Sequence, residues 1–209
     1  MTRLIETMAD IAEGCDWLGA AEPRFAAVHA ATGLPPLRRR PGGFGALLRA
    51  VVSQQLSVAS ADAVWGRLEA AGATEPVGIA ALDDGALRSA GLSRQKIRYA
   101  RALAAADLDF AALGRLEEDA AKAALTAIPG IGPWTAEIYL LFAVGRADVF
   151  APGDLALQEA VRDLFCLEAR PREAPLRAMA EAWSPWRGVA ARLLWAHYRH
   201  LKRRDGVAG

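Results

Sequence analysis

Cysteine is nearly absent from this chain of 209 residues, which has only Cys15 and Cys166. Two cysteines cannot form the disulfide framework of a small secreted domain, and they cannot supply the four thiolates of an iron–sulfur cluster. No group of cysteines and histidines has the spacing of a zinc site, and the three histidines show no catalytic spacing. We therefore expect both cysteines to be small, buried, apolar side chains.

The sequence also lacks a long apolar run and a strong excess of charge of one sign. No run approaches the ~20 apolar residues of a membrane-spanning helix. The first residues carry Glu6 and have no apolar core of a signal peptide, which predicts a cytoplasmic protein. The formal net charge of +1 gives no overall signal for nucleic acid. Any affinity for DNA must therefore come from local basic patches.

Alanine is abundant, apolar residues recur at helical spacing, and the alternation typical of β-strands is scarce. The length allows one good core or two small lobes. Ser93 and Asp83 are expected helix N-caps, and Pro185 after Ser184 is expected at the first position of the last helix. The expected helices are residues 2–13, 23–31, 45–52, 57–71, 79–81, 83–90, 94–106, 109–113, 117–127, 134–144, 155–164, 173–181 and 185–200.

The stretch Ile128-Pro129-Gly130-Ile131-Gly132-Pro133-Trp134 predicts a glycine hairpin between two helices. Gly130 and Gly132 can adopt φ > 0 and allow another backbone to approach closely, and Pro133 suits the first turn of the next helix. N–H groups that point outward at a helix start can bind an anion, here a DNA phosphate. The expected DNA contacts are Gly130, Ile131, Gly132 and Thr135. The alternative is an ordinary turn between two helices.

Asp154 follows the Pro152-Gly153 break and has two interpretations, which can both hold. On position alone it is an N-cap for the helix expected at 155–164. The second interpretation is catalysis on a nucleotide. Cleavage of an N-glycosidic bond builds positive charge on C1′ of the sugar, and a fixed carboxylate stabilises that charge and can orient the attacking water.

Three aromatic side chains are candidates for a base pocket: Trp134, which opens the second hairpin helix, together with Trp195 and Tyr139. An aromatic face attracts a base that alkylation has made cationic. The alternative is that these side chains belong to the core, where large aromatic residues are common.

The loop Ser53-Gln54-Gln55-Leu56-Ser57 interrupts two apolar helices. It is either a polar connection capped by Ser57 or a wedge loop, in which Gln55 or Leu56 fills the gap that an extruded base leaves in the duplex. Lys96 either reaches a phosphate near a helix start or is solvated. The basic runs at 38–40 and 202–204 are interpreted as solvated surface, most strongly the terminal one.

Together these motifs resemble the helix–hairpin–helix superfamily of DNA glycosylases, and within it the DNA-3-methyladenine glycosylase II family of alkylation repair. The resemblance covers about residues 40–200 and depends on segments 52–57, 125–136 and 148–155, with 183–187 as a further match. It implies an all-α fold of two helical lobes with an active-site cleft between them. The expected lobes are about 40–115, and about 1–39 together with 116–209.

The resemblance also implies roles for single residues. Asp154 matches the catalytic aspartate, Trp134 and Trp195 match aromatic positions of the base pocket, and Gln55 matches the wedge position. Relatives bind a monovalent cation through hairpin carbonyls, and the matching residues are Thr126, Ile128 and Ile131. A structural Na⁺ or K⁺ ion is thus the one bound group expected here, and no cofactor is required.

Bifunctional members of the superfamily carry a lysine at the position of Trp134, and without that amine no Schiff-base step is expected there. The sequence therefore predicts a monofunctional glycosylase that hydrolyses alkylated bases such as 3-methyladenine and 7-methylguanine from double-stranded DNA. We expect a monomer of a bacterial-type cytoplasm, associated with the nucleoid through DNA, without an iron–sulfur cluster and without membrane contact. The chain is expected to lack most of the N-terminal β-rich domain of longer alkylation glycosylases.

Two alternatives stay open. One is a glycosylase for oxidised or deaminated bases. The other is a non-catalytic helix–hairpin–helix module that only binds DNA.

Overall fold

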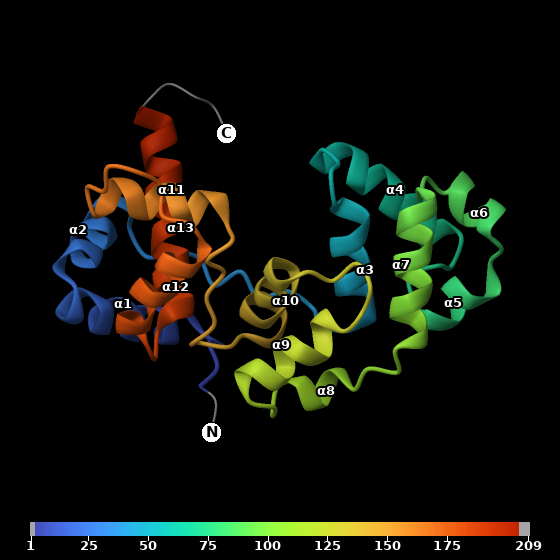
Figure 1. The fold of residues 1–209 in the computed structure, drawn as a ribbon, viewed down its shortest axis with the longest axis horizontal. Coiled ribbons are helices and arrows are strands. Elements are labelled where there is room, and N and C mark those ends of the chain that lie inside the picture. Colours follow the sequence, from blue (N-terminus) through green and yellow to red (C-terminus); the bar gives the residue numbers. More distant parts are fainter. Residues whose placement is uncertain (1–2, 205–209) are drawn as a thin grey trace. The chain divides into compact units, whose positions relative to one another are not determined.

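A computed structural model of the chain describes residues 3–204, and nearly all of its regular structure is helical. The β-pairing within these residues is one isolated bridge between Leu4 and Arg146. The all-α prediction is therefore confirmed. The helices form two compact units: unit 1 comprises Met1–Arg39 and Leu140–Gly209, and unit 2 comprises Arg40–Tyr139 (Figure 1).

Unit 1 is built around α13 (Arg187–Arg204), which packs on α11 (Leu155–Leu164), α2 (Pro23–Thr32) and α1 (Met8–Ala21). Its other elements are the π-helical turn η1 (Leu140–Val144), α12 (Glu173–Ala180) and the 3₁₀ turn η2 (Glu181–Trp183). A Cβ atom on Gly14 of α1 would lie 2.6 Å from Val189 of α13. Glycine therefore lets these two helices pack closely, and Val189, Leu193 and Leu194 of α13 are fully buried.

Unit 2 has α7 (Arg94–Ala105) packed on α3 (Phe44–Ser53), α5 (Pro76–Ala81) and α6 (Asp84–Ser89). Helix α3 also contacts α4 (Val58–Ala70) and α10 (Pro133–Tyr139), and α10 contacts α9 (Glu118–Thr126). The short α8 (Phe110–Leu113) precedes α9. The apolar face of α3 is buried in this unit, and each such side chain stabilises it by about 1.5–3 kcal/mol. Its members are Leu47, Leu48, Val51 and Val52.

The predicted N-caps Ser93 and Asp83 are confirmed. The Ser93 hydroxyl oxygen accepts the Lys96 N–H at 3.2 Å, and the Asp83 carboxylate accepts the Ala86 N–H at 2.7 Å. Each cap satisfies an amide that has no partner within its helix.

Two predicted helices have the wrong bounds. The first helix begins at Met8 rather than at residue 2, because Thr7 and Asp10 form a capping box, and it continues to Ala21 rather than ending at residue 13. Thr2 lies outside the described residues. The last helix begins at Arg187 rather than Pro185. The Ser184 hydroxyl donates to the Asp148 carboxylate at 2.8 Å instead of capping α13, and the Ser184–Pro185 peptide is cis.

The division between the units differs from the expected lobe boundary near residue 115. Residues 116–139 belong to unit 2. The physical reason is that α10 packs on both α9 and α3, which joins the hairpin helices to the helices before them.

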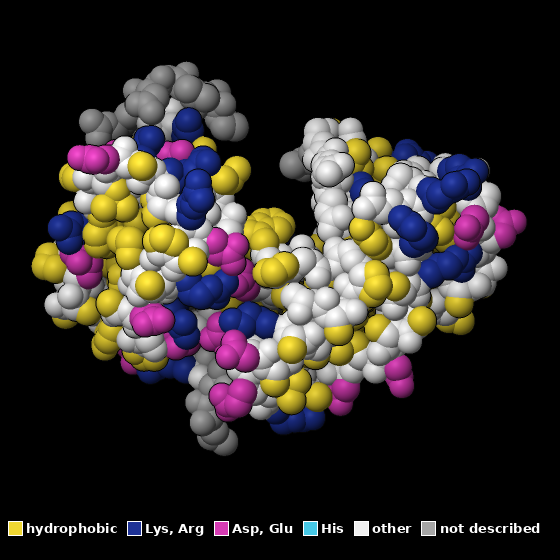
Figure 2. Space-filling view, in the orientation of Figure 1, with side chains coloured by type: hydrophobic (Ala, Val, Ile, Leu, Met, Phe, Trp, Pro, Cys, Tyr) yellow, Lys and Arg dark blue, Asp and Glu magenta, His cyan; other side chains and the backbone are white. Residues whose placement is uncertain are grey.

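The surface mixes acidic and basic side chains on the face that Figure 2 shows, as a net charge of +1 suggests. Within residues 3–204, no helix is both long enough and apolar enough to span a membrane. Cys15 is buried, as expected, but Cys166 is exposed, so the prediction of two buried cysteines was half wrong. Cys166 follows the end of α11 with a positive φ of 52°, at a turn on the surface rather than in the core.

Candidate active site and nucleic-acid interface

The glycine hairpin joins α9 to α10 by a tight turn. The Ile131 N–H donates to the Ile128 carbonyl at 3.0 Å, and the Ala136 N–H donates to the Gly132 carbonyl at 3.0 Å. Ile128 and Ile131 are only 5% and 4% exposed, whereas Gly132 and Pro133 are exposed. Pro133 is the first residue of α10, as predicted. The isoleucines thus anchor the turn in unit 2 while its glycine-proline segment faces outward.

The two hairpin glycines have different roles. Gly130 has a φ of 93°, and a Cβ atom there would lie 2.4 Å from the ring of Tyr99. Gly132 has no positive φ, and no atom beyond its chain neighbours in the described residues lies within 4 Å of its Cβ position. The expectation of φ > 0 is therefore right for Gly130 and wrong for Gly132. The backbone conformation and the Tyr99 side chain therefore require glycine at position 130, whereas the space beside Gly132 is open.

The loop between α3 and α4 is tied to this hairpin. The side-chain amide of Gln54 donates to the Gly130 carbonyl at 2.9 Å. Gln55 follows with an unusual positive φ of 57° and is exposed, and Leu56 is 40% exposed. Residues held in this conformation cost free energy and are concentrated at functional sites. The two segments predicted to contact DNA therefore form one connected surface of unit 2.

Lys96 of α7 is hydrogen-bonded to the start of the same loop. Its ammonium donates to the carbonyls of Val52 at 2.7 Å and of Gln54 at 2.8 Å, at the end of α3. Burial lowers the pKa of this ammonium. Two of its three N–H bonds are thus directed at backbone carbonyls rather than outward. Lys96 positions the loop, and its predicted contact with a phosphate stays a prediction.

Asp154 caps α11, as one of the two interpretations required. Its Oδ1 atom accepts the N–H groups of Ala156 at 2.9 Å and Leu157 at 3.1 Å. The same oxygen accepts the indole N–H of Trp195 at 3.2 Å. The carboxylate is half-buried at the N-terminus of a ten-residue helix, where the helix dipole stabilises negative charge. Three donors on one oxygen therefore hold this carboxylate in a fixed orientation.

Trp195 is brought directly to Asp154 within unit 1. It projects from α13 and is half-buried, and its ring packs on Phe142 with centroids 5.6 Å apart. The Arg192 guanidinium lies 4.8 Å from the centre of the same Phe142 ring. Trp195 thus orients the carboxylate with its N–H, a role that the sequence did not indicate, and its ring is held by aromatic packing.

The other two predicted pocket aromatics differ in exposure. Trp134 is 47% exposed in the first turn of α10, next to the hairpin. Tyr139 is only 6% exposed, and its hydroxyl accepts the Gly43 N–H at 2.8 Å. Burial raises the pKa of this phenol. The geometry therefore favours a structural role for Tyr139. Thr135 is 7% exposed and presents little side-chain surface.

The hairpin carbonyls expected to bind a cation are those of Thr126, Ile128 and Ile131. The Ile128 carbonyl accepts the Ile131 N–H within the turn, and a carbonyl oxygen has a second lone pair for a metal ion. Carbonyl oxygen is a suitable ligand for Na⁺ or K⁺. The donor set fits a monovalent ion, which stays a prediction. Within residues 3–204 no three His, Cys, Asp or Glu side chains are grouped as metal ligands.

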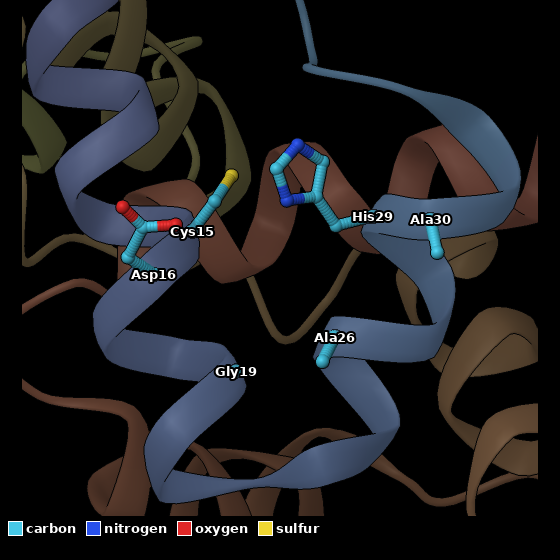
Figure 3. A pocket seen from close by; sticks show the side chains of 6 residues that line it. All are labelled: Cys15, Asp16, Gly19, Ala26, His29 and Ala30. Atoms are coloured by element: carbon cyan, nitrogen blue, oxygen red, sulfur yellow. The ribbon is translucent and has the colours of Figure 1, made fainter.

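Two cavities of the described structure lie apart from Asp154. One, of about 300 Å³ between α1 and α2, places Cys15, Asp16 and His29 on its wall (Figure 3). Burial raises the pKa of the Cys15 thiol to about 12, so it is not a nucleophile at neutral pH. The second is a groove of about 880 Å³ in unit 2, and Leu56 is one of the residues that line it. The charged side chains Arg49 and Asp62 on its wall form an ion pair at 2.6 Å.

Sequence reasoning missed Gln54 and Tyr99. The adjacent glutamines at 54 and 55 were a visible signal, but only the geometry shows that the first one holds the hairpin. No pattern in the sequence indicates that the Tyr99 ring covers Gly130, because the two residues are distant along the chain.

The hairpin, the loop between α3 and α4 and Asp154 lie within a stretch that matches a known family, and Trp195 lies beyond it. Residues 48–187 match the HhH-GPD superfamily of base excision DNA repair proteins. A DNA-3-methyladenine glycosidase of Bacillus halodurans has a similar structure, with a TM-score of 0.83 and 30% identity over 97% of this chain and 94% of that one. Schizosaccharomyces pombe 3-methyladenine DNA glycosylase, solved with abasic DNA, has a TM-score of 0.74 and 27% identity over 88% and 95% of the two chains.

The chain therefore belongs to the HhH-GPD superfamily, as the resemblance implied. Among curated relatives, DNA-3-methyladenine glycosylase 1 of Schizosaccharomyces pombe is 32% identical over 158 residues, which are 71% of this chain and 69% of that protein. A Bacillus subtilis relative is 29% identical, and this chain spans 58% of its length.

Proposed function

We propose that this protein is a DNA glycosylase that removes alkylated bases from duplex DNA and so starts base excision repair. The observation that carries the proposal is the Asp154 carboxylate, which two backbone amides and the Trp195 indole fix at the start of α11. The names of the similar proteins support the same substrate class, because they act on 3-methyladenine.

The reaction follows from the charge that each group carries. The bond between C1′ and the base nitrogen breaks, and its electron pair goes to the base. A base such as 3-methyladenine or 7-methylguanine is cationic while attached, so it leaves as a neutral molecule and needs no strong general acid. Asp154 stabilises the positive charge that develops on the sugar, and because it is already oriented, no reorganisation is required. Water adds to C1′ and releases a proton, for which a carboxylate can act as base.

The remaining elements bind the DNA. The hairpin holds a phosphate through backbone amides other than that of Ile131, which is bonded within the turn, and Gly132 leaves room for the backbone of the DNA to approach. The Gln55-Leu56 loop enters the duplex in place of the extruded nucleotide, whose extrusion costs a few kcal/mol. Trp134, which is 47% exposed, contributes aromatic surface to the binding of the base. The Thr126, Ile128 and Ile131 carbonyls would hold a Na⁺ or K⁺ ion, which would add positive charge to the hairpin.

The product is an abasic site on an intact strand. Trp134 stands where bifunctional relatives have lysine, and an indole cannot form a Schiff base with the sugar. We infer that the protein acts as a monomer in the cytoplasm, associated with the nucleoid through DNA.

The test is base release from duplexes that each carry one lesion: 7-methylguanine, 8-oxoguanine or uracil. We expect release of the methylated base, no strand cleavage until alkali is added, and no protein–DNA adduct with borohydride. Asp154→Asn keeps an N-cap side chain but removes the charge, so it is expected to fold, to bind DNA and to lose base release.

The panel separates the alternatives. Release of only the oxidised or deaminated base would assign another lesion class. Binding without release from any duplex would indicate a DNA-binding module. Full activity of Asp154→Asn would contradict the catalytic role of the carboxylate.

A further inference from the structure

Arginine side chains from two distant segments of unit 1 gather beside Trp195. Arg38, which precedes α3 in sequence, lines one small pocket together with Trp195, Arg192 and Arg199 of α13. Arg203 lies one helical turn beyond Arg199. We call Arg38, Arg192, Arg199 and Arg203 the arginine cluster. Their mutual proximity is also seen in the pKa of Arg199, which burial lowers first and the charges of Arg38 and Arg203 lower further.

Three members of the cluster, Arg38, Arg199 and Arg203, have no carboxylate partner in the part of the chain that the structure describes. Within residues 3–204, Arg38, Arg199 and Arg203 form no ion pair, and no acidic group contributes to the pKa shifts of Arg192 and Arg199. Elsewhere on the same helix a carboxylate does reach a basic side chain, because the Asp163 carboxylate lies 2.7 Å from the His197 ring. Like charges repel one another, so an uncompensated group of guanidinium ions is stabilised only when an anion joins it.

The base of the cluster is rigid. Arg192 is 2% exposed, and its two terminal nitrogens donate to the carbonyls of Gly188 at 2.7 Å and Leu141 at 3.2 Å. Its Nε atom is buried without a hydrogen-bond partner in the described structure. The pocket that it lines has a volume of about 10 Å³, which is room for about one water molecule. The fixed positive charge of Arg192 is therefore buried beside the exposed Arg38 and the half-exposed Arg199.

The position of the cluster identifies the anion. Trp195 lines the pocket and also donates its indole N–H to Asp154 at 3.2 Å. An anion at the cluster is thus one side chain away from the proposed catalytic carboxylate. In the proposed reaction, the anions nearest to the reacting sugar are its own flanking phosphodiesters. Arginine suits this ligand because its planar guanidinium can donate two parallel hydrogen bonds to phosphate oxygens.

We propose that Arg38 and Arg199, supported by Arg192 and Arg203, bind a phosphodiester group of the DNA backbone next to the nucleotide on which Asp154 acts. This inference rests on the proposed function. It gives unit 1 a DNA contact of its own, separate from the hairpin of unit 2. It also explains how Trp195 and Asp154 are aligned with the sugar, because one phosphate of the substrate is held on the same structural base.

The test measures the affinity of Arg199→Gln and Arg38→Gln for a duplex with an uncleavable abasic-site analogue, by fluorescence anisotropy over roughly 50 to 200 mM salt. Each variant is expected to bind roughly tenfold more weakly, and the slope of log K against log salt is expected to fall by about 0.9, the value for one lost phosphate contact. Arg199→Lys keeps the charge and is expected to keep most of the slope. Arg170→Gln is the matched control, because Arg170 pairs with Glu159 on the same unit.

The outcomes separate the site from the proposed function. If Arg199→Gln and Arg38→Gln bind like Arg170→Gln with the wild-type salt slope, the phosphate site is refuted even where Asp154-dependent base release is observed. If the slope falls but no lesion is released by the wild-type protein, the site stands and the proposed function fails. If inorganic phosphate raises the melting temperature through Arg199 while DNA affinity does not depend on Arg199, the ligand is a free phosphate and the DNA assignment is refuted.

Discussion

Replacement of Gly130 by alanine is the perturbation for which the structure makes the strongest quantitative prediction. Gly130 has a φ of 93°. A Cβ atom added there would lie 2.4 Å from Cγ of Tyr99, and Cδ2 and Cβ of the same side chain would lie within 2.8 Å. These contacts cannot be relieved by a movement of the flexible end of Tyr99, because they involve Cβ and the adjoining ring atoms. Gly132, two residues on, has neither a positive φ nor a close neighbour. It therefore provides a matched control within the same hairpin.

The expected cost has two parts. A left-handed backbone conformation costs an L-residue about 1–2 kcal/mol, and a methyl group forced into a packed site costs about 1–3 kcal/mol. Gly130→Ala should therefore destabilise the protein by about 2–5 kcal/mol. That is a large part of the 5–15 kcal/mol typical of folded proteins, and it corresponds to a fall in melting temperature of roughly 5–15 °C at this length. Gly132→Ala should change stability by less than about 1 kcal/mol.

Urea unfolding followed by circular dichroism measures both values. Tyr99→Ala in the Gly130→Ala background should recover the steric part, so a double-mutant cycle should show a favourable coupling of about 1–3 kcal/mol. For DNA binding, the variant with the larger expected effect on the hairpin contact is Gly132→Ala rather than Gly130→Ala. Gly132→Ala, although stable, should weaken duplex binding by about tenfold, since its methyl group occupies the space for the phosphate. Wild-type stability of Gly130→Ala would refute the reasoning about the hairpin, and wild-type DNA affinity of Gly132→Ala would refute the phosphate contact.

Three further predictions concern other contacts. Trp195→Phe keeps an aromatic side chain but removes the N–H donor to Asp154, a charge-assisted hydrogen bond of about 1.5–3 kcal/mol. Single-turnover base release should therefore slow by roughly 10- to 100-fold while DNA affinity changes little. An unchanged rate would exclude the positioning role of Trp195. Lys96→Met removes the donor to the Val52 and Gln54 carbonyls, so it should lower the free energy of unfolding by about 1–3 kcal/mol and weaken DNA binding by the loop between α3 and α4. Arg88→Met, at an exposed position, should change neither quantity. Burial raises the pKa of Cys15 from 9.0 to about 12, so the unfolded thiol ionises first and stability is lost as pH rises from 9 towards 12. Between pH 8 and pH 10.5 the wild type should therefore lose about 2 kcal/mol more than Cys15→Ala, and equal losses would contradict the shift.

Helices could be predicted where capping and periodicity agree. Ser93 and Asp83 are side chains whose oxygens reach amides within the next turn, so the sequence alone contains the interaction. The same local logic failed at Pro185, because Ser184 binds Asp148 across unit 1 rather than the adjacent helix. Local rules describe the alternatives available to a side chain, and a tertiary partner decides between them.

The site shows the same limit. A glycine hairpin is visible in the sequence, but the different demands on Gly130 and Gly132 depend on Tyr99, which no spacing rule connects to them. Lys96 was a candidate for phosphate binding because it lies near a helix start. In the structure it donates to carbonyls at the end of α3, a contact that exists only once α7 packs on α3, and its contact with a phosphate stays a prediction.

Asp154 shows why a structural role and a catalytic role need not compete. The sequence indicated two roles that can both hold, an N-cap and a reactive carboxylate, and the cap is present. The bonds that cap α11 are the same bonds that fix the carboxylate, and a charge stabilises a transition state best when it is oriented beforehand. Asn and Asp are similarly good N-caps, so Asp154→Asn separates charge from capping, while Asp154→Ala removes both. We therefore expect Asp154→Asn to retain wild-type stability within about 1 kcal/mol and lose base release, and Asp154→Ala to lose both activity and about 1–2 kcal/mol. An Asn variant as active as the wild type would mean that the capping of α11 alone explains this residue.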